Sequence, residues 1–101
     1  RIEGVGSSIT PTLNQTLTCT PPTYRTAGVT NSFAWFATSS LVVDPSTGTL
    51  VGEGSSLVMS EAVETAMAGK PNLHCVVTGS NLGGSVKLAS FRVLVNFPFT
   101  R

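Results

Sequence analysis

The chain is built from short segments in which apolar and polar residues alternate, separated by residues typical of turns. In the segment 14–20, Leu17 and Cys19 fall on one side and threonines on the other, which is the pattern of a strand with one buried face. Similar segments follow at 33–37, 41–43, 49–51, 55–59, 73–77 and 85–95. Seven or eight short strands at roughly ten-residue spacing predict an all-β fold, a sandwich or a barrel. The expected core includes Trp35, Phe33, Leu17, Leu57, Leu73 and Val77.

Turn residues and one helical segment interrupt the strands. Pro21 and Pro22 end the first strand because a prolyl nitrogen cannot donate to a ladder. The run Asp-Pro-Ser-Thr-Gly at 44–48 is typical of a turn. Only the segment 61–68 has a helix-favouring composition, with Ser60 as the expected N-cap and Gly69 as the stop, which predicts about one or two helical turns. A hairpin loop is expected at 79–84, and a shift of the apolar positions predicts a β-bulge near 89–90.

Composition and charge narrow the function classes. Charged residues make up 11% of the 101 residues, against about 25% in a typical soluble domain, and Ser and Thr fill much of the difference. The net charge is +1 and the basic residues are scattered, so no nucleic-acid partner is expected. Because there is no signal peptide and no run of about 18 apolar residues, we expect no direct membrane insertion. We interpret the chain as one module of a longer protein, with a single domain at 1–96 and a linker to a following module at 97–101.

The two cysteines and the single tryptophan narrow the fold. Cys19 lies on an early strand, Cys75 on a late strand, and Trp35 on a strand between them. This order resembles the core of immunoglobulin domains, in which a disulfide joins two sheets and the tryptophan packs on it. The resemblance implies an immunoglobulin-like two-sheet β-sandwich with Greek-key topology, a short helical turn before strand F and a Cys19–Cys75 disulfide. Two reduced cysteines, buried as small hydrophobic residues, are the alternative.

Longer motifs resemble a particular group of immunoglobulin-like domains. Three segments resemble the repeats of large bacterial and bacteriophage surface and virion proteins. They are the run from Pro11 to Pro21, Phe-Ala-Trp at 33–35 and Cys-Val-Val-Thr-Gly-Ser-Asn-Leu-Gly-Gly-Ser at 75–85. The resemblance covers most of the chain, from Pro11 to about Val86. Leu73 departs from animal immunoglobulin domains, which carry the tyrosine of the tyrosine corner at this position. The resemblance implies a non-catalytic structural module that spaces and assembles a larger extracellular, filament or virion surface protein.

No constellation of residues predicts catalysis, a metal site or a cofactor. The single histidine, His74, alternates with Cys75 and is therefore expected to face solvent. Two cysteines and one histidine pointing the opposite way do not supply four convergent metal ligands. Glu61 and Glu64 are interpreted as exposed acids that favour the start of the helix. The glycine-rich loop at 79–84 precedes a strand, so it is not a phosphate-binding loop.

Binding to another molecule is the remaining question. The candidate partner contacts are Tyr24, Arg25, Asn81, Phe97 and Phe99, the last two because aromatic residues after the final strand are expected to be poorly buried within one sandwich. The expected partners are neighbouring modules of the same or an associated protein. The alternative is an adhesive or carbohydrate-binding module that contacts a receptor or glycan through its end loops.

A modification site is also conceivable from the sequence. The tripeptide Asn14-Gln15-Thr16 matches the acceptor sequence for N-glycosylation. Asn14 is therefore a candidate glycosylation site if the protein is eukaryotic and secreted.

Overall fold

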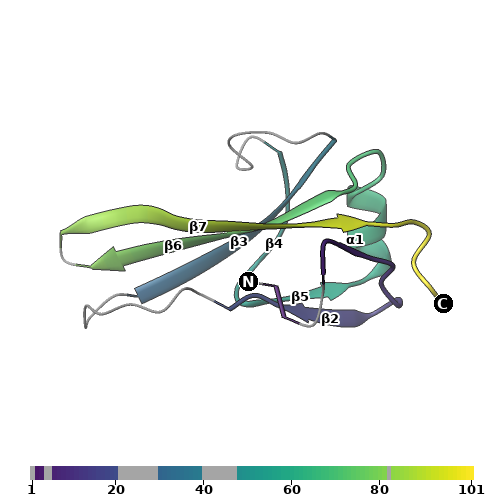
Figure 1. Cartoon of the computed structure of the whole chain (residues 1–101), viewed down its shortest axis with the longest axis horizontal. Coiled ribbons are helices and arrows are strands. Elements are labelled where there is room, and N and C mark those ends of the chain that lie inside the picture. Colours follow the sequence, from purple (N-terminus) through teal and green to yellow (C-terminus); the bar gives the residue numbers. More distant parts are fainter. Residues whose placement is uncertain (1, 4–5, 21–29, 40–47, 82) are drawn as a thin grey trace.

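The chain forms two β-sheets and one short helix (Figure 1). The computed structural model describes residues 2–3, 6–20, 30–39, 48–81 and 83–101. One sheet has five strands in the order β1-β7-β6-β3-β4, and the other pairs β2 with β5. The elements are β1 (Ser8–Ile9), β2 (Gln15–Thr18), β3 (Thr30–Thr38), β4 (Thr49–Glu53), β5 (Ser56–Met59), α1 (Glu61–Ala66), β6 (Asn72–Asn81) and β7 (Gly84–Val95). The fold is thus mostly β and two-layered, as the alternation predicts.

Strand β6 lies at the centre of the larger sheet and is antiparallel to both neighbours, β3 and β7. The pairing of β6 with β7 shifts register between Val77 and Thr78, where β7 contributes one extra residue, Leu88. The sequence predicts this bulge at 89–90, one residue further along. The hairpin turn between the two strands is shorter than the predicted loop at 79–84, because β6 continues to Asn81 and β7 begins at Gly84.

One strand pairing has no counterpart in the sequence-based prediction. The two residues of β1 pair in parallel with the end of β7, Ser8 opposite Leu94 and Ile9 opposite Val95. Two residues are too few to show an alternating pattern, so the sequence does not reveal this strand. The strand predicted at 41–43, most of the turn at 44–48 and the two prolines at 21–22 lie outside the described residues.

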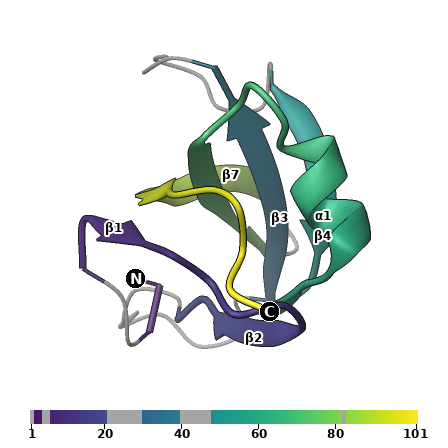
Figure 2. The same ribbon diagram turned by 90° about the vertical axis from the view of Figure 1, so that its right-hand side faces the viewer.

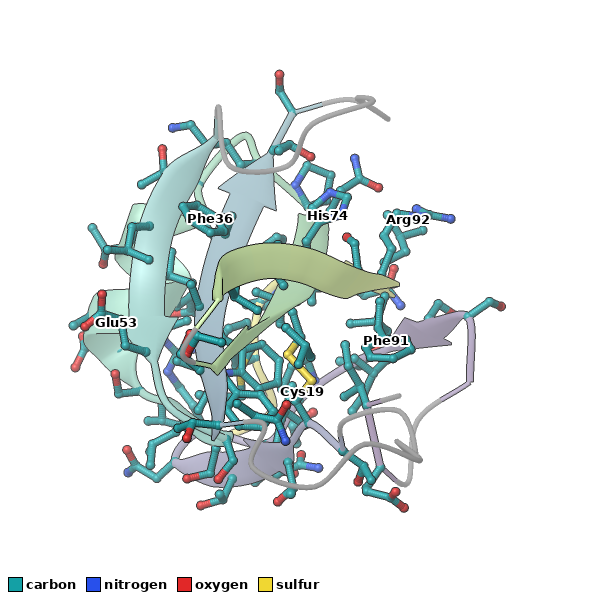
Figure 3. The ribbon with its side chains drawn as sticks, turned by 90° about the vertical axis from the view of Figure 1, so that its left-hand side faces the viewer. Cys19, Phe36, Glu53, His74, Phe91 and Arg92 are labelled. Atoms are coloured by element: carbon teal, nitrogen blue, oxygen red, sulfur yellow. A yellow bond between two sulfur atoms is a disulfide. The ribbon has the colours of Figure 1, made fainter. Side chains whose placement is uncertain are left out.

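The core lies between the two sheets and is crossed by a disulfide bond between Cys19 and Cys75 (Figure 3). Trp35 is fully buried beside it, and its indole Nε1 donates a hydrogen bond to the carbonyl oxygen of Gly54 at 2.9 Å. Phe33 is partly buried against this core. The core also contains the other four residues that the alternation places inward, Leu17, Leu57, Leu73 and Val77.

The helix α1 covers one end of the sandwich. Ser60 caps it, because the hydroxyl Oγ accepts a hydrogen bond from the backbone N–H of Val63. Val63 on the helix and Met67 at its C-cap are buried, so this side of the helix packs on the core. The helix ends at Ala66, two residues before the predicted end, and Gly69 adopts a positive φ of 75° in the following turn.

Candidate functional site

The described residues contain no arrangement typical of an enzyme's metal centre. No group of three or more His, Cys, Asp or Glu residues comes together within the described ranges. No helix in the described part of the chain is both long and apolar enough to cross a membrane. Two clusters of hydrogen-bonded polar side chains are described below, one on the larger sheet and one at the C-terminal segment.

The first cluster surrounds His74 on the face of the larger sheet that points away from the disulfide (Figure 3). The sequence predicts a solvent-facing His74, and this prediction is wrong, because the residue is only 5% exposed. His74 sits on the central strand, with Phe36 on β3 and Arg92 on β7 as its cross-strand neighbours. Alternation correctly assigns His74 to the face opposite Cys75, but it does not show whether that face is covered.

Hydrogen bonds connect the polar residues of this cluster. Thr38 Oγ1 and His74 Nε2 are 3.0 Å apart, with donor and acceptor set by the imidazole tautomer. Arg92 Nη1 donates to Asn72 Oδ1 at 2.7 Å, and Asn72 Nδ2 donates to the carbonyl oxygen of Thr38 at 3.5 Å. Burial lowers the pKa of His74 from 6.5, and the positive charge of Arg92 lowers it further. A neutral imidazole that is held by Thr38 joins β3 to β6, and this cluster therefore acts as a structural link.

The second cluster holds the C-terminal segment 97–101 against the domain (Figure 2). Glu64 on α1 accepts a hydrogen bond from the backbone N–H of Phe99 at 2.7 Å. The guanidinium of Arg101 bonds both carboxylate oxygens of Glu64, forming an ion pair. The hydrogen bond from Arg101, followed by that from Phe99, lowers the pKa of Glu64 below 4.5. The interpretation of Glu64 as an exposed acid is therefore wrong, since its side chain is 16% exposed and links α1 to the end of the chain.

Phe99 is part of the core, which contradicts the predicted poor burial of this residue. It is 2% exposed, whereas Phe97 is 39% exposed and stacks on it with ring centroids 5.5 Å apart. Between Phe99 and Arg101, Thr100 pairs in parallel with Thr12: its N–H donates to the carbonyl of Pro11, and its carbonyl accepts from the N–H of Leu13. The segment 97–101, predicted as a linker, thus contacts the domain through side chains and backbone alike.

A shallow depression lies at the junction of β3 and β4. Among the described residues that line it, the carboxylate of Glu53 is the one ionisable group, and the side-chain oxygen of Asn31 is buried there without a described hydrogen-bond partner. A single exposed acid and one amide do not form a catalytic pair. The residues lining the depression are Asn31, Ser32, Phe33, Ala34, Glu53, Gly54 and Thr78.

Of the predicted contact residues, the structure describes the side chains of Phe97 and Phe99. Tyr24 and Arg25 lie outside the described residues, and so does the side chain of Asn81, whose backbone pairs with Gly84 at the tip of the hairpin. Asn14 is exposed in the turn before β2, where it adopts a positive φ of 69° that asparagine tolerates. Its modification stays a prediction.

The sequence-based reasoning missed Glu64 and Arg101 as partners. The two residues are 37 positions apart, and neither stands in a motif that links them. The only hint in the sequence is that an arginine, Arg101, stands two residues after the aromatic Phe99, and this pattern does not name Glu64 as its partner.

No protein-family model matches the chain, and no curated protein and no solved structure shows significant similarity to it.

Proposed function

We propose that the chain is a non-catalytic immunoglobulin-like structural module of a larger extracellular, filament or virion surface protein, and that it acts in spacing and assembly through protein–protein contacts. The observation that carries this proposal is the disulfide between Cys19, next to β2, and Cys75 on β6, which connects the two sheets beside the buried Trp35. That combination is the hallmark of the immunoglobulin core.

The order of the strands supports the immunoglobulin-like assignment. Three adjacent strands, β3, β6 and β7, match strands C, F and G, and β4 extends that sheet as strand C′ does in variable-type domains. On the opposite sheet, β2 pairs with β5 as strand B pairs with strand E. The helix α1 occupies the connection before strand F. The smaller sheet has only two strands among the described residues, and Leu73 replaces the corner tyrosine, so the module departs from the animal receptor pattern.

The burial of the reactive and aromatic residues supports a structural role over catalysis or glycan binding. Both cysteines form the disulfide, and Trp35 and Phe99 are buried in the core. Glycan-binding sites usually present exposed aromatic rings, and Phe97 is the large aromatic residue with substantial exposure among those described. The end-loop alternative rests on Tyr24 and Arg25, outside the described part, and stays a prediction.

The disulfide also supports the proposed location outside the cytosol. Disulfides form and persist in oxidising environments and are rare where thiol reductants are abundant. A cell-surface, secreted or virion-surface location is therefore part of the proposal. Among the described residues, the large apolar side chains exposed for protein contacts are those of Leu50, Val58, Leu94 and Phe97.

Cross-linking mass spectrometry of the parent protein in its native assembly tests this proposal. Lys70, on the loop after α1, is expected to give cross-links to neighbouring modules or to other protein subunits. The matched comparison is a glycan array probed with the disulfide-bonded chain, with the reduced chain as control, and no binding is expected. Saturable glycan binding by the oxidised chain, with no cross-link to any protein, would contradict the structural role and support the adhesive alternative.

A further inference from the structure

We propose that the C-terminal strap, residues 99–101, exchanges between two copies of this chain, so that the strap of each copy occupies its seat on the other. The seat is formed by the backbone of Pro11 and Leu13 and by the carboxylate of Glu64. This inference rests on the proposed assembly function and deepens it, because it names the partner and the contact.

The seat recognises three consecutive residues in three different ways. The Phe99 ring is buried, and its N–H donates to Glu64. The backbone of Thr100 forms two hydrogen bonds of 2.7 Å, one to Pro11 and one from Leu13, which adds a short parallel strand next to the turn before β2. The guanidinium of Arg101 binds both oxygens of Glu64 as a fork. An apolar anchor, backbone pairing and a planar ion pair together form a recognition site for Phe-Thr-Arg.

The connection to the strap allows it to leave the domain without disturbing the sheet. The last backbone hydrogen bonds before the strap are those of Val95 to Pro71 and of Asn96 to Ile9, both at 2.8 Å. Residues 97 and 98 follow, and both are exposed. Rotation within this exposed connection moves the strap away while β7 keeps its pairing with β6. The hinge of the exchange is therefore the segment 97–98, after the bond of Asn96 to Ile9.

The partner that fits the seat is a second copy, because the segment already bound there belongs to this chain. The seat can make the same contacts with Phe99, Thr100 and Arg101 of another molecule. The free energy of the exchanged dimer therefore differs from that of two monomers only through the hinge conformation and the entropy lost when two molecules associate. Reciprocal exchange closes a two-fold dimer in which both seats are filled. Figure 1 shows the C-terminus at one end of the long axis, so the two copies would meet end to end.

Trapping with engineered thiols at positions 12 and 100 provides the decisive experiment. Thr12 and Thr100 are exposed bridge partners, so the double variant Thr12→Cys, Thr100→Cys places two thiols side by side wherever a strap is seated. The full chain is prepared in light and heavy isotopic forms, concentrated separately, mixed, equilibrated and then oxidised. Exchange predicts disulfide-linked peptides that join a light and a heavy copy. Bridges confined to light–light and heavy–heavy pairs within monomers would overturn the proposal and leave the spacing function untouched.

A second measurement covers the role of Glu64 in the seat. Light scattering after size-exclusion chromatography is expected to show a concentration-dependent dimer for the wild-type chain. Glu64→Gln keeps the shape of the side chain but removes its charge, so it is expected to raise the dissociation constant of the dimer several-fold. Glu53→Gln, an exposed acid on β4, is the matched control and is expected to leave the dimer unchanged. Equal effects of the two variants, or a monomer at every concentration, would contradict strap exchange.

Discussion

Phe99 is the most informative single residue to change, because sequence and structure give opposite expectations for it. The alternation places it beyond the last strand in a linker, whereas the structure places its ring in the core with 2% exposure. Phe97, two residues earlier, is 39% exposed and provides a matched control with the same side chain in the same segment. We therefore compare Phe99→Ala with Phe97→Ala.

The expected loss follows from the buried area. A buried aromatic side chain removes roughly 150–250 Å² from water, and at about 25 cal/mol per Å² this contributes about 4–6 kcal/mol as an upper estimate. Measured Phe-to-Ala losses in cores are about 3–5 kcal/mol. Because Phe99 follows an exposed connection, the strap can shift toward the space left by the ring, so we expect the lower end, about 3 kcal/mol. Phe97→Ala removes a stacked but half-exposed ring and is expected to cost about 1 kcal/mol.

Equilibrium unfolding in urea under non-reducing conditions measures both losses. Trp35 is the only tryptophan and is fully buried, so its emission reports the loss of the core. A loss of about 3 kcal/mol is a large part of the roughly 5–15 kcal/mol that stabilise a typical domain. Similar midpoints for the two variants, with unchanged slopes, would show that the Phe99 ring is not a core residue and would refute the reasoning about the strap.

The remaining predictions concern the disulfide, the buried histidine and a closely packed glycine. Replacing both Cys19 and Cys75 with Ala is expected to cost about 4 kcal/mol in denaturant unfolding, from a closed loop of 56 residues, and a loss below about 1 kcal/mol would contradict this. The free energy of unfolding is expected to fall as the pH drops through and below 6.5, because the imidazole of His74 takes up a proton more readily in the unfolded chain than in the folded one. Wild-type stability that does not decline between about pH 7 and 5, or a decline that is unchanged in His74→Gln, would contradict this role of His74. Gly48→Ala is expected to cost about 1–3 kcal/mol, because the new Cβ would lie 2.5 Å from a backbone carbonyl oxygen of β3, whereas Gly6→Ala meets nothing within 4 Å and provides the control in the same assay.

The strands and much of the core follow from the sequence because both depend on local periodicity. Side chains alternate between the two faces of a strand, so a buried face appears as an apolar residue at every second position. Leu17 on β2 and Cys19 just after it, and Leu73, Cys75 and Val77 on β6, show this pattern and are all buried. The helix is predicted for a similar reason, because its N-cap and the glycine after it are local signals.

The contacts that the sequence does not reveal are those between polar residues far apart in the chain. Glu64 and Arg101 are 37 positions apart, and Thr38 and His74 are 36 positions apart. Each of these residues, taken alone, is compatible with a solvated surface, which is the usual environment of its type. Their pairing is set by how the sheets and the helix pack, and no local pattern encodes that packing.

The burial of both faces of β6 limits where a partner protein binds. One face of β6 lies in the core, and on the other face Asn72, His74 and Val76 are each at most 6% exposed. Strand β6 is therefore covered on both sides, but Leu50, opposite Phe36, and Leu94, opposite Asn72, are exposed on the outward face at 49% and 37%. A partner protein can therefore reach the flanks of this face and the end of the domain where Arg101 binds Glu64. Strand β6 is excluded as a direct contact, so a partner on the outward face would have to bind β4 or β7.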